Sequence, residues 1–316
     1  MTTVLSYIFH FPFNYVLEET DLFRVIIVVS FFIYASKSDW KTRRVKDITW
    51  IVLGTLALMV LWVDLLDKNA SAISQSILLP IAFLFYDIFW DREEGAKTST
   101  GLIALILYIL AFAWILYISY TLFIGSTNWS EEISGPLIAF IMIVFFEILY
   151  IFDIIRGGAD AKALICLAIL FPWYPQLIDN LPIIMPQLEV ASTIFVFALS
   201  VLFIAALISV TMPLYFLLKN VKSGQRITAR SLVGFTIPID NVKKHFVWLI
   251  EWIEDENLKF SARKPRDSET LEDDLEALRS YGKKDIWVTY KIPFIIPMTA
   301  AIIIVLSIGN PLFLLY

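Results

Sequence analysis

Long apolar runs separated by short polar segments constrain this chain more than any other feature. They begin near Leu22 and recur as far as Leu314. A run of about 20 apolar residues can cross a bilayer as a helix, because a helix satisfies its own backbone hydrogen bonds. The 316 residues are 59% hydrophobic with a mean hydropathy of +0.74, which excludes an ordinary soluble domain. We therefore predict an all-α polytopic membrane protein with about eight transmembrane helices.

The distribution of basic residues predicts the orientation of these helices. Loops that are rich in Lys and Arg stay on the cytoplasmic side of a membrane. If the segment after the first span is cytoplasmic, all of the 25 Lys and Arg residues except Arg24 and Lys68 lie on that side. We therefore expect a multi-pass protein of the cell (plasma) membrane with both termini outside.

The apolar runs divide the chain into three parts. Residues 1–218 contain about seven spans and form the predicted membrane domain. Residues 219–291 carry nearly balanced charge, short β-branched runs and one stretch of helical spacing. We expect this part to form a small α+β cytosolic module. Residues 292–316 form the predicted final transmembrane helix.

Two aspartates stand at the ends of apolar runs. Asp160 opens one run directly after Gly157 and Gly158, and Asp39 follows the first run. The two glycines are expected to end the preceding helix in the left-handed conformation of a C-cap. A carboxylate beside a membrane span is costly unless it is used. Asp39 follows the first predicted span and Asp160 follows the fifth, so both acids are expected at the cytoplasmic face. Two close carboxylates there, one ionised and one protonated, indicate an aspartyl protease.

The helix macrodipole distinguishes the two acids. Asp160 begins a helix, where the dipole favours the anion, whereas Asp39 ends one. We therefore predict that Asp160 is the more acidic of the two. Structural explanations stay open: Asp160 as a helix N-cap, and Asp39 as an interfacial acid paired with Arg43. Lys162 either orients Asp160 or extends to the interface as a basic anchor.

Both aspartates lie in segments that resemble known motifs. Asp160 with its glycine turn and Lys162 is similar to the Gly-x-Gly-Asp-x-Lys signature of the type IV prepilin peptidases, although Ala159 replaces the second motif glycine. Asp39, a basic stretch and then Asp47 resemble the first aspartate motif of that family, in which bacterial members commonly carry Asn at the position of Asp47.

Two further features make the chain more similar to archaeal than to bacterial members. The Cys-x-x-Cys zinc pairs of many bacterial members are missing, since Cys166 is the single cysteine. The sequence Lys-Ile-Pro-Phe at positions 291–294 precedes the last apolar run, as in archaeal prepilin and preflagellin (archaellin) peptidases.

The resemblance implies a hydrolase, an aspartic endopeptidase of the membrane, with its active site at the cytoplasmic face. Such an enzyme removes the short basic leader of type IV pilin-like or archaellin precursors. Carried over by position, the motifs imply Asp39 and Asp160 as catalytic residues, with Gly157, Gly158 and Lys162 in supporting roles.

The expected partners are the precursor proteins and the lipid bilayer, with no nucleic acid. Aspartyl chemistry needs neither a metal nor an organic cofactor. A Cys/His metal site is also excluded, because Cys166 is the only cysteine and the two histidines, His10 and His245, are far apart in the chain. The sequence leaves the oligomeric state open.

Other carboxylates support alternative functions. Glu147 lies well inside an apolar run, and Tyr86-Asp87 near the end of another resembles the Tyr-Asp pair of presenilin-like proteases. The chain lacks the Pro-Ala-Leu motif of those proteases. A proton- or ion-coupled transporter that uses Glu147 and Asp87 is the main alternative from another class. An inactive scaffold derived from an enzyme is a third.

Overall fold

The computed structural model describes residues 19–90, 99–124, 130–175, 182–184, 196–261, 271–291 and 293–315. It is mostly helical with a small sheet region toward the C-terminus, which confirms the helical part of the predicted fold class. The chain forms two compact units. We call Met1–Ala205 together with Phe294–Tyr316 the helical unit, and Ala206–Pro293 the α+β unit.

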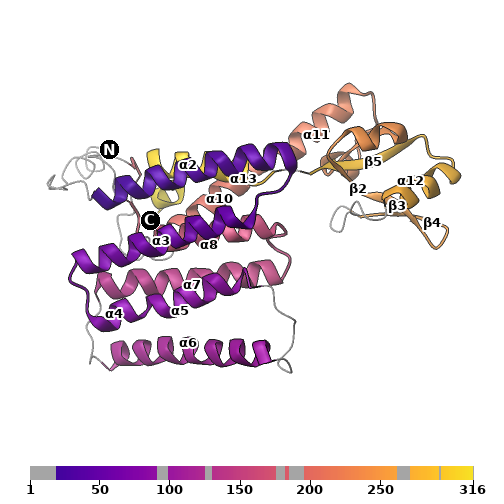
Figure 1. The fold of residues 1–316 in the computed structure, drawn as a ribbon. Helices are drawn as coiled ribbons and strands as arrows, with labels where there is room; N and C mark the ends of the chain where they lie inside the picture. Colours follow the sequence, from indigo (N-terminus) through magenta and orange to yellow (C-terminus); the bar gives the residue numbers. More distant parts are fainter. Residues whose placement is uncertain are drawn as a thin grey trace, which may run out of the picture. The chain divides into compact units, whose positions relative to one another are not determined.

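The helical unit is built from helices (Figure 1). In chain order these are α2 (Glu19–Thr42), α3 (Asp47–Asp67), α4 (Ala72–Ser76), α5 (Leu78–Asp87), α6 (Ser99–Phe123), α7 (Glu131–Ile151), α8 (Gly158–Leu170), α10 (Phe197–Ser209), whose last residues belong to the α+β unit, α13 (Ile295–Ser307) and the short η4 (Pro311–Leu315).

Four segments in the described part of the chain are long and apolar enough to cross a membrane. They are Asp47–Asp67, Ser99–Phe123, Glu132–Ile151 and Phe197–Lys222. The expected eight spans are not confirmed. Helices α8 and α13 have 13 residues each, a length of about 20 Å against a hydrocarbon core of about 30 Å.

The core of the helical unit lies where α3, α7 and α8 pack together, and these helices run side by side in Figure 1. Helix α8 is almost entirely buried after its first turn. Helix α3 buries one face, with Trp50 and Leu53 fully covered. On that face Gly54 admits the ring of Phe85 from α5, since a Cβ at this position would lie 2.0 Å from the ring. The contacts of α8 with α3 and α7 fix its position in this unit.

Helix α13 packs against α2, and hydrogen bonds of side-chain hydroxyl groups join the two helices. The side chains of Ser36 on α2 and Thr299 on α13 are hydrogen-bonded at 2.7 Å. Thr299 also donates to the carbonyl of Phe32 at 3.2 Å. In an apolar environment such polar contacts fix the rotation of one helix against another. They place the first turn of α13 beside the end of α2.

The α+β unit is built on an antiparallel sheet of order β1-β5-β2, in which Thr236 pairs with Trp287 and Trp248 with Thr289. A separate hairpin, β3-β4, turns at Asp255 and Glu256. The elements are α11 (Thr211–Lys222), η1 (Ala229–Leu232), β1 (Phe235–Pro238), η2 (Ile239–Lys244), β2 (Val247–Leu249), β3 (Glu251–Glu254), β4 (Asn257–Phe260), α12 (Leu271–Ser280) and β5 (Asp285–Tyr290).

One hydrophobic core holds the α+β unit together. Central strand β5 alternates in burial and turns Ile286 and Val288 inward, where Leu278 of α12 and Phe216 of α11 cover them. Helix α11 also contributes Asn220, whose side-chain amide donates to two backbone carbonyls. Helix α11 thus belongs to the α+β unit, which begins at Ala206.

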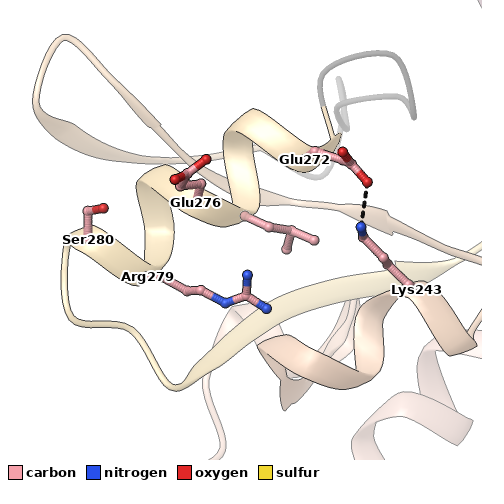
Figure 2. Close-up of a pocket in the computed structure, with 6 residues that line it drawn as sticks. Lys243, Glu272, Glu276, Arg279 and Ser280 are labelled. Atoms are coloured by element: carbon pink, nitrogen blue, oxygen red, sulfur yellow. Dashed lines mark hydrogen bonds and ion pairs between the residues drawn. The ribbon is translucent and has the colours of Figure 1, made fainter.

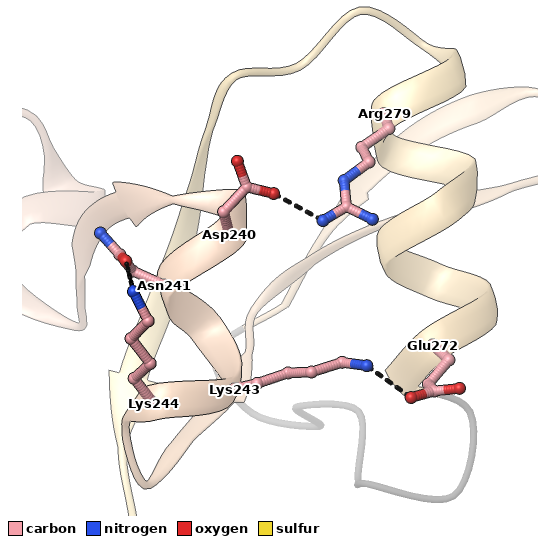
Figure 3. Close-up of polar contacts among 6 residues, drawn as sticks. All are labelled: Asp240, Asn241, Lys243, Lys244, Glu272 and Arg279. Atoms are coloured by element: carbon pink, nitrogen blue, oxygen red, sulfur yellow. Dashed lines mark hydrogen bonds and ion pairs between the residues drawn. The ribbon is translucent and has the colours of Figure 1, made fainter.

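Two exposed ion pairs join α12 to η2 (Figure 3). Arg279 donates to Asp240 at 2.6 Å, and Lys243 donates to Glu272 at 2.5 Å. Exposed pairs of this kind contribute only about 0–1 kcal/mol each. Burial of the apolar face of α12, rather than these pairs, therefore attaches the helix.

Substituting Leu278 tests this account of the α+β unit. Leu278 is fully buried, so Leu278→Ala should lower the free energy of unfolding of this unit by about 2–5 kcal/mol. Hydrogen exchange at the amides of β5 measures this quantity locally. Leu232→Ala is the matched control, because Leu232 is 44% exposed and its truncation should change the value by less than about 0.5 kcal/mol. Equal effects of the two substitutions would contradict the assigned core.

Candidate active site

Asp39 lies in the last turn of α2, just before a tightly bonded turn. The backbone N–H of Arg43 donates to the carbonyl of Asp39 at 2.9 Å, and Arg43 has a left-handed φ of 56°. The carbonyl of Arg44 accepts hydrogen bonds from the side chains of Ser38 and Thr42, both at 2.9 Å. The connection from α2 to α3 is therefore held by its own side chains.

Three influences act on the carboxyl group of Asp39. Burial raises its pKa, whereas the positive charge of Arg43 and a hydrogen bond from the backbone N–H of Ile295 lower it, and burial is the largest. Ile295 is the first residue of α13, where the free N–H groups and the macrodipole favour an anion. The net pKa is raised from its ordinary value of 3.8.

Asp160 lies in the first turn of α8, with its carboxylate folded back over Gly157. A Cβ at residue 157 would lie 2.1 Å from Oδ2 of Asp160, closer than atoms can approach. A Cβ at Gly158 would meet nothing closer than the hydroxyl of Tyr150, at 3.5 Å. A side chain at position 157 would therefore force the Asp160 carboxylate to move, whereas one at position 158 would not.

The expected C-cap role of the two glycines is wrong. Helix α7 ends at Ile151, and the left-handed residue beyond its end is Asp153, with φ 55°. Gly157 has an ordinary extended conformation and is the N-cap of α8. The two glycines do lie at the turn between α7 and α8, but they begin α8 rather than end α7.

The pKa of Asp160 is raised to about 7, first by burial and second by the negative charge of Asp39. Helix α8 is not one of the four candidate membrane helices, and Asp160 precedes its buried part. The two acids are therefore close enough to act on one another. The prediction that Asp160 is the more acidic is wrong, because burial outweighs the favourable end of the helix dipole.

Lys162 connects the segments that contain the two acids. Its ammonium group donates to Oδ1 of Asp47, the first residue of α3, at 2.6 Å. It also lies 4.8 Å from the centre of the Phe89 ring. Asp47 and Lys162 are 115 residues apart, and no spacing in the sequence indicates their contact.

Glu147 and Asp87 form a second group of carboxylates among α5, α6 and α7. Asp87 accepts a hydrogen bond of 2.5 Å from the hydroxyl of Tyr108, and its charge acts on Glu147. Asp87 is the last residue of α5, and Glu147 lies one turn before the end of α7. Both therefore belong to neighbouring helix ends rather than to a path along the helices.

The α+β unit contains a shallow surface pocket beside α12 (Figure 2). Its charged lining includes Lys243 and Arg279, which are paired with Glu272 and Asp240. The lining residues are Lys243, Glu272, Leu275, Glu276, Arg279 and Ser280. They are typical of a solvated helix face and offer no arrangement of nucleophile and base.

Residues 228–310 match a protein-family model described as Archaeal Peptidase A24 C-terminus Type II. The matched region contains the sheet of the α+β unit and all of α13. It includes Ile295 but neither Asp39 nor Asp160. No curated protein matches the chain.

The contact between Gly157 and Asp160 predicts different results for two similar substitutions. Gly157→Ala should displace the Asp160 carboxylate, because the end of a flexible side chain moves more easily than the backbone. Infrared titration of the protonated carboxyl band, assigned by comparison with Asp160→Asn, should then show a shifted midpoint. Gly158→Ala should leave the band and its midpoint unchanged. If the two alanine variants titrate alike, Asp160 does not occupy the space above Gly157.

Proposed function

Since the match of residues 228–310 supports an archaeal prepilin or preflagellin peptidase family for this chain, we propose that it is a membrane aspartic endopeptidase with Asp39 and Asp160 as catalytic residues. The observation that carries the proposal is the action of the Asp39 charge on a partly buried Asp160. Two carboxyl groups that interact in this way share one proton over a range of pH.

The surroundings of the two acids favour different protonation states. Arg43 and the N–H of Ile295 stabilise the anion of Asp39, so Asp39 is the general base. Asp160 retains the proton, because burial and the charge of Asp39 raise its pKa to about 7. In this arrangement one acid can accept a proton while the other donates one.

The proposed reaction needs only these two groups and one water molecule. Asp39 removes a proton from the water as its oxygen attacks the carbonyl carbon of the scissile peptide bond. The protonated Asp160 donates a hydrogen bond to the carbonyl oxygen as the carbonyl carbon becomes tetrahedral. Collapse of this intermediate breaks the C–N bond, and the proton taken from the water passes to the leaving amine.

The proposed substrates are type IV pilin-like or archaellin precursors. Such a precursor has a short basic leader followed by an apolar helix, so its scissile bond lies near a membrane face. Basic residues follow Asp39 in the sequence, among them Lys41, Arg44 and Lys46. Because such residues stay cytoplasmic, they support a site at the cytoplasmic face.

Neutral substitution of either acid tests the proposal. Asp39→Asn and Asp160→Asn should each lower the rate of precursor cleavage by about 10²–10⁴-fold, since each removes one proton-transfer step. The measurement is leader removal by purified full-length protein in detergent or lipid. Glu147→Gln should still cleave, which separates the peptidase from a transporter that uses Glu147. Cleavage by Asp39→Asn at the wild-type rate would reject the proposed mechanism.

The pH dependence provides a second test. Asp160 in the folded state has a pKa of about 7 against an ordinary value of 3.8, so between these values the native state holds a proton that the unfolded state releases. Its contribution to stability is complete below about pH 4 and is lost as the pH rises through about 7. The rate of cleavage should also fall as the pH rises through about 7, because Asp160 then loses the proton that it donates.

Thermal unfolding and cleavage rates between pH 4 and 9 measure both effects. Asp160→Asn should remove this contribution from the pH dependence of the unfolding midpoint. Wild-type cleavage that stays constant up to pH 9 would argue against Asp160 as the proton donor.

A further inference from the structure

Three separate elements meet at the side chain of Lys162. Lys162 comes from the first turn of α8, Asp47 from the first turn of α3, and Phe89 from the segment after α5. The side chain of Lys162 is only 18% exposed, whereas that of Asp47 is 61% exposed. A lysine held this closely by an acid and a ring face has a defined position.

Helix geometry turns Lys162 away from the acid that is nearest in sequence. Residues two apart on an α-helix lie on nearly opposite faces, so Asp160 and Lys162 point in different directions. The charge that acts on Asp160 is that of Asp39, while the ammonium group of Lys162 is bonded to Asp47. Lys162 thus acts through α3 rather than by direct contact with Asp160.

A short and well-bonded connection joins Asp47 to Asp39. Helix α2 ends at Thr42, and α3 begins at Asp47. Between them, the carbonyl of Arg44 accepts hydrogen bonds from the side chains of Ser38 and Thr42. The position of the start of α3 is therefore transmitted to the last turn of α2, which carries Asp39.

We propose that Asp47 is a positioning residue: by pairing with Lys162 it holds the start of α3 against the first turn of α8 and so sets the separation of Asp39 and Asp160. The contacts form a closed path from Asp39 through the turn to Asp47, across the ion pair to Lys162, and along α8 to Asp160. This inference rests on the proposed function, because it assigns a role in the same reaction.

A purely structural role for Asp47 makes a different prediction. An acid in the first turn of a helix stabilises that helix through the macrodipole, and the N-cap of α3, Lys46, makes no side-chain capping bond. In that case substitutions at Asp47 would change stability and leave the catalytic constants of the folded protein unchanged. The separation of kcat from KM distinguishes the two roles.

The experiment is a double-mutant cycle in the full-length protein with a precursor that has a basic leader. Asp47→Asn and Lys162→Met should each lower kcat on the order of tenfold with little change in KM, as expected for coupled residues. The variant with both substitutions should be no slower than the slower single variant, since the pair acts as a unit. Asp47→Glu keeps the charge and should recover most of the wild-type kcat.

Asp67→Asn is the matched control, because Asp67 is an exposed aspartate at the other end of α3. It should leave kcat unchanged. An unchanged kcat in Asp47→Asn, or single-variant losses that multiply in the combined variant, would overturn the role of Asp47 while the proposed function stands. Wild-type cleavage rates in Asp39→Asn would instead reject the proposed function, and with it this inference.

Discussion

The candidate site depends on the interaction between two carboxylates that cannot both be charged at low cost. Asp39 is stabilised as an anion by Arg43 and by the backbone N–H of Ile295, and its charge in turn disfavours ionisation of Asp160. When two carboxyl groups lie close together and are partly shielded from water, one stays protonated and acts as the acid while the other is ionised and acts as the base. The arrangement of α2, α3, α8 and α13 serves to keep these two groups together.

Much of this fold is visible in the sequence, because hydropathy reports burial in lipid or protein. It predicted helices almost throughout and a small α+β part near the C-terminus. It could not predict span lengths, since an apolar run looks alike in a membrane and in a protein core. Helix α8 illustrates this ambiguity, because it is buried by α3 and α7 and has only 13 residues. Helix α11 shows the same ambiguity, because it lies in the candidate span Phe197–Lys222 while its Phe216 belongs to the core of the α+β unit.

In the candidate site, the sequence predicted features that depend on neighbouring residues but not those that depend on contacts between distant residues. Asp39, Asp160 and Gly157 stood out because each is unusual beside an apolar run. The sequence could not predict why a glycine stands at position 157, because the reason is that the Asp160 carboxylate folds back over this residue. The order of acidity was predicted from the helix dipole, a local property, whereas burial by distant residues decides it. The partner of Lys162 was hidden for the same reason, because Asp47 precedes it by 115 residues.

The family match and the two acids lie in different parts of the chain, and Ile295 joins them. Residues 228–310 contain neither Asp39 nor Asp160. They do contain the first turn of α13, where the backbone N–H of Ile295 donates a hydrogen bond to Asp39. A helix start directed at a carboxylate lowers its pKa without a charged side chain. The hydroxyl contacts between Ser36 and Thr299 fix α13 in the rotation that keeps this N–H near Asp39. The matched region therefore contributes a backbone donor to the candidate site, so a peptidase family defined on residues 228–310 bears physically on the acid that we propose as the base.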